Sequence, residues 1–353
     1  MKKLMKFWFT VGFMWNVLPD IKAYASKAFS ALAAYTPREF NRKSRCLSDL
    51  AHFTAKEFRT ILLYTGPPVL KNILPKTQFN HFLFLHAAYR ILNDENSIQE
   101  EEILQYAHEL LRKFVQHFPN VYHRMFISFN VHALLHLVFF VRRFKKTLYH
   151  LSAYPFESFL RQFKLGKLIK SSNAPIIQVA RRLYEFAVLM IPLNRKKCEE
   201  RKQRVGLRSK ITNCRPDEKK FKVFQTENFC FDVSTEANRF CEVDGKEIFK
   251  IQHFISGIDG ELYASDTVLT NLISLYTIPC PSQLLGIYAG SAPKTFDPNT
   301  LEVIPVTRIT GKFFRIPILP HIVPKQRQDY EPSDAFVRLL HNDILVSDAL
   351  VHF

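Results

Sequence analysis

A charged segment with few apolar residues separates two halves of this chain that have different residue patterns. Residues 195–220 hold 11 Lys or Arg and 4 Asp or Glu. Because such a composition cannot bury a core of its own, it predicts a linker. Apolar residues before it follow the spacing of helices, and those after it form short β-prone runs. The sequence therefore predicts an α+β fold with a helical domain at 1–190, a basic linker at 191–222, a β-rich module at 223–320 and a tail at 321–353.

Capping signals and helix-breaking residues divide the first half into helices. Residues 1–35 are expected to form one or two helices. Thr54–Glu57 and Ser97–Glu100 have capping-box form, and each marks the start of a helix. Gly66-Pro67-Pro68 is expected to end the first of these helices, and Pro119 the second. Further helices are predicted over 78–92, which reads as buried, and over 126–144, 155–166 and 175–187.

Short runs rich in β-branched and aromatic residues follow the linker. Asp244-Gly245 and Asp259-Gly260 are typical of tight turns between antiparallel strands. The runs predict strands over 231–233, 247–255, 262–264, 286–288, 303–309 and 313–318.

The positive charge of the chain is concentrated in its first half and in the linker. The net charge is +17, of which residues 1–194 carry +15, residues 195–220 carry +7 and residues 221–353 carry −5. This distribution favours a polyanionic partner, most simply nucleic acid. The alternative is a basic surface that only keeps the protein soluble. The linker itself reads either as a solvated segment or as a nuclear-localisation or DNA-contact patch.

Targeting signals give a mixed picture. The first 25 residues imitate a secretory signal, but Lys6 interrupts the apolar region, and an amphipathic helix is the other reading. The six cysteines are widely spaced and form no C-x-x-C pair, which favours a reducing compartment. The best candidate membrane span, Met125–Val141, contains two His and an Asn, so we expect no membrane anchor. Nuclear localisation is the prediction.

Two histidines form the most distinctive local pattern. His132 and His136 lie four residues apart, so on a helix both imidazoles share one face and can reach one metal ion. A chain with 13 His contains about 0.5 such pairs by chance, so two hydrogen-bonded core histidines are the alternative. The H-E-x-x-H motif of metalloproteases is not present here.

Glu157 follows the histidines by 21 residues, in the first turn of the predicted helix 155–166. It reads as a catalytic carboxylate or as an acid placed where the helix dipole favours it. Arg161 and Lys164 share its face and either bind phosphates or form a surface salt bridge. Arg142 and Arg143 are further candidate nucleic-acid contacts.

Several stretches resemble, in the same order, the C-terminal half of CACTA/EnSpm-type DNA transposases. The similarity extends from residue 1 to about residue 310. It rests on Met1–Met5, Pro37–Lys43, Lys56–Pro67, Asn130–Leu137, Ser152–Glu157, Ala237–Cys241, Thr277–Cys280 and Leu285–Tyr288.

The resemblance implies a DNA strand-transfer enzyme with an RNase H-like core. In that family three carboxylates hold two Mg²⁺ or Mn²⁺ ions, which activate the attacking water or 3′-hydroxyl. By this resemblance Glu157 matches the third carboxylate. His132 and His136 match the histidine half of a zinc site whose other half is a C-x-x-C pair, as in the similar V(D)J recombinase core. The helical domain would then be part of the RNase H-like core.

The chain departs from the family in its other metal ligands. The first two aspartates and the C-x-x-C pair of the family precede the segment that Met1–Met5 resembles. Asp20, Asp49 and Asp94 do not match them. We therefore expect a transposase-derived protein that is DNA-associated in origin and lacks strand-transfer activity as an isolated chain. The alternatives are a non-enzymatic DNA-binding or protein-interaction module, and a subunit completed by a second copy or by a separate N-terminal transposase half.

Overall fold

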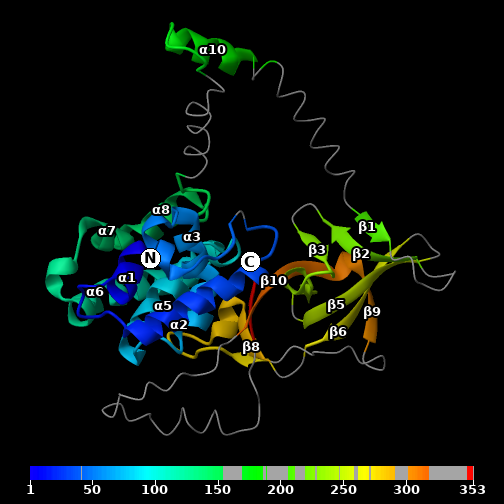
Figure 1. The fold of residues 1–353 in the computed structure, drawn as a ribbon, viewed down its shortest axis with the longest axis horizontal. Helices are drawn as coiled ribbons and strands as arrows, with labels where there is room; N and C mark the ends of the chain where they lie inside the picture. The colour runs from blue at the N-terminus through cyan, green and yellow to red at the C-terminus, as the bar shows by residue number, and fades with distance from the viewer. Residues whose placement is uncertain are drawn as a thin grey trace, which may run out of the picture.

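The computed structural model describes residues 1–40, 42–153, 169–185, 188, 206–210, 219–226, 229–245, 247–257, 261–269, 272–290, 301–317 and 348–352. Helices occupy the N-terminal half, and a curled antiparallel sheet occupies the C-terminal part (Figure 1). The predicted α+β fold class is therefore confirmed.

The helices of the N-terminal half pack around one aromatic-rich core. Helix α5 packs along α6, and the indole N–H of Trp8 in α1 donates to the Tyr122 hydroxyl at the end of α6, 3.0 Å away. Both side chains are fully buried, so this bond satisfies two polar groups inside the core. The described α-helices are α1 (Lys2–Phe9), α2 (Pro19–Ala31), α3 (Ala55–Thr60), α4 (Gly66–Leu70), α5 (Lys76–Ile91), α6 (Glu101–Tyr122), α7 (Phe129–His132), α8 (Leu137–Phe144) and α10 (Pro175–Glu185).

The prediction that Gly66-Pro67-Pro68 ends a helix is wrong. A π-helical turn, Ile61–Thr65, joins α3 directly to α4, and the Gly66 N–H donates to the Ile61 carbonyl. The two prolines then occupy the first turn of α4, where no backbone donor is required. A Cβ on Gly66 would lie 2.3 Å from the Ile61 oxygen. Glycine is thus needed because the widened turn brings the backbone of residue 61 against it.

The two predicted capping boxes have different outcomes. At Thr54 the capping box forms as expected, and the Thr54 backbone N–H donates to the Glu57 carboxylate at 2.7 Å. At Ser97 the residues form a 3-10 turn, in which Asp94 accepts from the Ser97 backbone and hydroxyl. Helix α6 begins after this turn, at Glu101, and it continues past Pro119 for three residues. The prediction that Pro119 ends the helix is wrong, because the last turn closes through the His123 N–H and the Pro119 carbonyl.

The described strands join one antiparallel sheet in the order β1-β2-β5-β4-β10-β11-β8-β7. Strand β3 pairs with β2, β6 with β5, and β9 with β6. The strands are β1 (Gly206–Lys210), β2 (Lys219–Gln225), β3 (Cys230–Asp232), β4 (Phe240–Val243), β5 (Glu247–Ser256), β6 (Leu262–Val268), β7 (Ile273–Ser274), β8 (Ile287–Gly290), β9 (Leu301–Pro305), β10 (Ile309–Pro317) and β11 (Asp348–His352). The predicted turn at Asp244-Gly245 joins β4 to β5, with positive φ at both residues. The second predicted turn, Asp259-Gly260, lies outside the described residues.

Three strands lie where the sequence suggests a linker or a tail. Strand β1 and the start of β2 fall within 191–222, and β11 falls within 321–353. Strand β2 is stabilised by its neighbour, because Phe221 lies opposite Phe254 of β5. Strand β11 pairs with both β10 and β8. These pairings are long-range, so local composition does not reveal them.

One end of the sheet shares its core with the helices. Apolar residues of the β7–β8 region and of β10 belong to the same buried cluster as the helical half; they are Leu275, Tyr276, Ile287, Ala289, Phe314 and Ile316. A second cluster fills the curl of the sheet and includes Phe231, Phe249 and Phe254. In Figure 1, β8 and β10 lie between the helices and strands β5, β6 and β9. The two halves of the chain are therefore joined by packing as well as by the connecting segment.

Candidate functional site

The predicted histidine helix is broken into three parts. Helix α7 ends at His132, a 3-10 turn covers Ala133–His136, and α8 follows from Leu137. The 3-10 turn tightens the chain to about three residues per turn. The two imidazoles still meet, with ring centroids 5.3 Å apart and the rings steeply inclined to each other, at 70°. The structure therefore brings the predicted pair together on an exposed surface.

The histidine pair does not complete a metal site among the described residues. A structural zinc ion takes four ligands, and the pair supplies two. No group of three or more His, Cys, Asp or Glu side chains that could hold a metal occurs in the part of the chain that the structure describes. The resemblance implies zinc and Mg²⁺ or Mn²⁺ for the intact family, and it predicts no bound metal for this chain, which has only the histidine half of the zinc site and one of the three carboxylates. Glu157, Arg161 and Lys164 lie outside the described residues.

Helix α8 divides into a buried face and an exposed face. Val138 and Val141 are buried in the helical core. Phe139, Phe140 and Phe144 lie on the opposite face and are each about half exposed. We call these three residues the aromatic row.

Basic side chains lie at the C-terminal end of the aromatic row. Arg143, Lys145 and Lys146 are exposed at the end of α8, and Lys145 takes the left-handed conformation that ends the helix. Arg142 instead pairs with Glu101 of α6, 2.6 Å away, so the two adjacent arginines have different environments. Between Glu109 and Glu157 the sequence contains seven Lys or Arg and five His, and it contains no Asp or Glu. This part of the helical half therefore presents positive charge without neighbouring acids from its own segment.

A buried ion pair connects the helical half to the sheet. Lys312 of β10 has no exposed side-chain surface, and its Nζ lies 2.9 Å from both carboxylate oxygens of Glu39. The same ammonium donates to Asn238 Oδ1 at 2.6 Å and to the Cys230 carbonyl at 2.7 Å. Burial lowers the pKa of Lys312, and the charge and hydrogen bonds of Glu39 oppose that shift. The buried ammonium is thus stabilised by a full set of acceptors.

Further contacts extend this cluster. The Arg38 guanidinium binds the carboxylate of Asp232, and Glu39 also accepts from the Cys230 N–H at 2.9 Å. Two stretches that carry the family resemblance, Pro37–Lys43 and Ala237–Cys241, contribute Glu39 and Asn238. Neither residue carries a motif that predicts this contact. The sequence signal for the Glu39–Lys312 pair was weak, because Lys312 is one of two basic residues in β10, with Arg315, and lies just outside the predicted strand 313–318.

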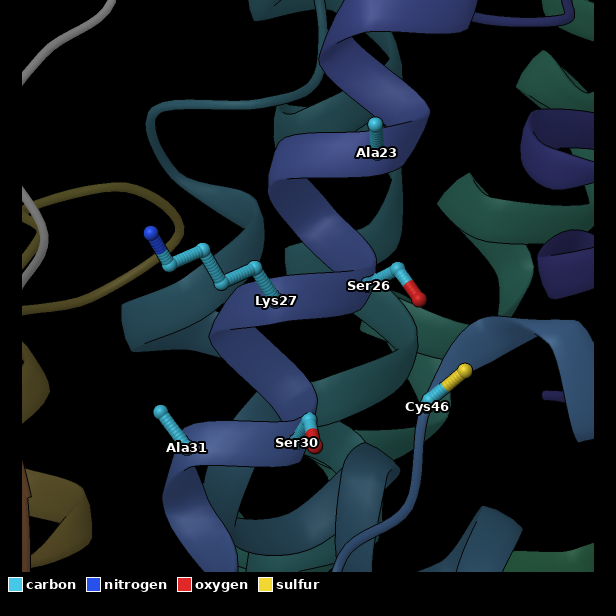
Figure 2. Close-up of a pocket in the computed structure, with 6 residues that line it drawn as sticks. All are labelled: Ala23, Ser26, Lys27, Ser30, Ala31 and Cys46. Carbon is cyan, nitrogen blue, oxygen red and sulfur yellow. The ribbon is translucent and has the colours of Figure 1, made fainter.

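A cysteine beside α2, Cys46, has hydrogen-bond partners close to its sulfur. Cys46 precedes a 3-10 turn, and its sulfur lies 2.6 Å from the Ser48 hydroxyl and 3.3 Å from the Ser48 backbone nitrogen. Hydrogen bonds from Ser26 and then from Ser48 lower the pKa of the Cys46 thiol. Figure 2 shows Ser26 and Cys46 facing one surface pocket, while the Lys27 amine points away from the sulfur. The pocket is lined by Ala23, Ser26, Lys27, Ser30, Ala31 and Cys46.

Comparisons with known proteins cover only the β-rich part. Residues 206–326 match the model of a domain of unknown function, DUF8592. The match begins at β1 and extends past β10, so it includes Asn238 and Lys312 but neither of the paired histidines. No curated protein and no solved structure matches the chain. Within the described residues, none of the helices has the length and apolar character required to cross a bilayer.

Proposed function

We propose that this chain is a transposase-derived, DNA-associated protein that binds DNA through the basic surface at the end of α8. The observation that carries the proposal is the exposed group of Arg143, Lys145 and Lys146 within a segment that contains no acid from residue 110 to residue 156. Cationic side chains that neutralise phosphates supply most of the affinity in such contacts. The resemblance to CACTA/EnSpm transposases, which extends on both sides of this segment, supports DNA as the polyanion.

The histidine pair lies in the same exposed region. His132 and His136 follow each other at four-residue spacing, one turn before Phe140 of the aromatic row. Neutral imidazoles donate hydrogen bonds to phosphate oxygens, and protonated ones add charge. We assign them to the binding surface rather than to catalysis.

We also propose that the isolated chain does not cleave DNA. Two described aspartates that precede Glu157 have structural partners: Asp49 pairs with Arg45 at 3.5 Å, and Asp94 accepts from Ser97. Asp20 is an exposed acid in the first turn of α2, where the helix dipole favours it. These roles support a chain whose acids serve folding. Divalent-dependent nicking of supercoiled DNA, lost in Glu157→Gln, would contradict this proposal.

Salt-dependent binding of a fluorescent duplex tests the interface. The double variant Arg143→Ala/Lys146→Ala should weaken binding and reduce the slope of log K against log salt by about 1.8, because two phosphate contacts are removed. The matched control is Lys27→Ala/Lys56→Ala, which removes two exposed lysines from α2 and α3. Equal losses in the two variants would mean that binding follows net charge alone and would refute this site. A wild-type chain without affinity at low salt would refute DNA binding altogether.

A further inference from the structure

Helix α10 presents an apolar face that the other described elements leave exposed. Ile176, Ile177, Leu183 and Tyr184 lie on one side of the helix and are 82%, 62%, 37% and 70% exposed. None of the described residues of α10 is buried, and Figure 1 shows the helix apart from the others. An isolated helix of 11 residues is only marginally stable in water. This face therefore needs an apolar partner.

The start of α10 is already organised. The side-chain amide of Gln178 donates to the Ser171 hydroxyl at 2.8 Å and also to the Asn173 carbonyl. Its oxygen accepts from the Lys170 N–H at 3.0 Å. These bonds tie the first turn of the helix to the residues that precede it. Pre-organisation of this kind reduces the conformational entropy that a docking contact must overcome.

Exposed apolar side chains concentrate in two segments of the described chain. Of the 20 exposed large apolar residues, seven lie between Met125 and Tyr149 and five between Ile176 and Val188. Soluble proteins seldom leave such patches uncovered. The first segment contains the aromatic row of α8, and the second contains α10 and Val188.

We propose that α10 docks its apolar face on the aromatic row of α8 in the same chain. Phe140 and Phe144 lie four residues apart and form a ridge with Phe139. The apolar residues of α10 are spaced at i, i+1, i+7 and i+8, so they form one helix face that can pack on this ridge. The charged residues Arg181 and Glu185 of α10 then stay in solvent. Arg143 lies on the same face of α8, four residues after Phe139 and three after Phe140, so docking of α10 competes with DNA binding at that residue.

The length of the chain between the two helices permits the contact. Fifteen residues separate Ala153 from Ile169. An extended chain spans at most about 3.6 Å per residue, so the available reach is roughly 50 Å. Helix α10 itself is about 16 Å long. The covalent connection raises the effective concentration of α10 at α8, which favours docking within the chain over docking between chains.

Site-specific photo-crosslinking of the full chain tests the proposal. Benzoylphenylalanine is introduced at Tyr184, on the apolar face, and at Glu185, on the polar face, as the matched control. Illumination should link residue 184 to the peptide containing Phe139–Phe144, at a yield roughly tenfold above that of the control, since only the apolar face meets the aromatic row. The reciprocal probe at Phe140 should link to residues 175–188. Leu183→Asp, which places a charge in the contact, should abolish both products.

Mixing heavy-isotope and light chains before illumination distinguishes docking within one chain from docking between two chains. Crosslinks that join peptides of one isotope only support docking within the chain. Mixed heavy–light products would show that a second copy occupies the aromatic row and would overturn the proposal. Equal crosslinking from residues 184 and 185, or products confined to other segments, would overturn it as well.

Discussion

The ammonium of Lys312 lies 2.9 Å from each carboxylate oxygen of Glu39, although the two residues are 273 positions apart in the chain. Lys312 has no exposed side-chain surface and Glu39 is 20% exposed. The pair connects β10 to the segment after α2, where the sheet meets the helical half. The pair thus lies at the boundary between the two halves, and its removal should affect the stability of both.

Glu39→Leu should lower the free energy of unfolding by about 3–5 kcal/mol, because it leaves the Lys312 ammonium buried without its counter-ion. The double variant Glu39→Leu/Lys312→Met should recover a large part of this loss, since neither position of the pair then carries a charge. Urea denaturation of both variants measures the difference. The exposed pair Arg308–Asp244 is the control, and Asp244→Asn should change stability much less. A double variant as unstable as Glu39→Leu would show that packing, not charge, is responsible.

Asp266 should make the β-rich part less stable as the pH rises. Burial, and secondarily the charge of Glu302, raise the pKa of Asp266 from 3.8 to about 8, and its carboxyl has no hydrogen-bond partner among the described residues. The unfolded chain releases the proton near pH 4, whereas the folded protein keeps it until about pH 8. In this interval the group lowers the free energy of unfolding by about 1.4 kcal/mol per pH unit.

Asp266→Asn should therefore gain stability relative to the wild type as the pH rises from about 4 to about 8. The measurement is urea denaturation across that range, with the difference between variant and wild type plotted against pH. Asp20→Asn, at an exposed position in the first turn of α2, should show a much flatter difference. A flat difference for Asp266→Asn too would mean that its carboxyl ionises normally in the folded protein.

Cys46 should react with iodoacetamide at neutral pH faster than Cys241 or Cys280. Hydrogen bonds from Ser26 and Ser48 lower the pKa of Cys46, whereas burial raises the pKa of the other two thiols. The thiolate is the reactive form, so a lower pKa increases the rate at neutral pH. Mass spectrometry of a time course measures each cysteine separately.

Ser26→Ala and Ser48→Ala should each slow the alkylation of Cys46, with the larger effect at Ser26. In urea the three cysteines should react at similar rates, which controls for the reagent. Unchanged rates in both serine variants would show that exposure alone determines the reactivity of Cys46.

Gly66→Ala should destabilise the helical half by about 1–3 kcal/mol, because the added methyl group would lie 2.3 Å from the Ile61 oxygen and 2.9 Å from the Phe82 ring. Thermal denaturation measures the loss. Ser30→Ala on the exposed side of α2 is the matched control and should stay within about 0.5 kcal/mol of the wild type. Unchanged stability of Gly66→Ala would mean that the π-helical turn relaxes into a regular helix at no cost.

The sequence predicted most elements whose signals are local. The capping box at Thr54 and the turn at Asp244-Gly245 appear where expected, because each depends on hydrogen bonds or dihedral angles within a few residues. The predictions that helices end at Pro67 and at Pro119 are wrong because of the way the chain closes at each proline. At the first, the π-helical turn places both prolines where no donor is needed; at the second, Pro119 lies in the final turn of α6.

The candidate site was predicted in part. The four-residue spacing predicted that His132 and His136 lie together, and their rings do meet, although a 3-10 turn interrupts the predicted helix between them. Local pattern did not show that Arg142 pairs with Glu101 while Arg143 stays exposed. That difference depends on where α6 lies relative to α8, which only the folded core specifies.

The sequence by itself determined the α+β class and the order of helices and strands, because residue periodicity is set by the geometry of each element. Only the tertiary structure decided that Lys312 meets Glu39, that β11 inserts between β10 and β8, and which face of α8 is left exposed. These relationships join segments tens to hundreds of residues apart. Their stability comes from burial and pairing between those segments, and no short stretch of sequence contains both partners.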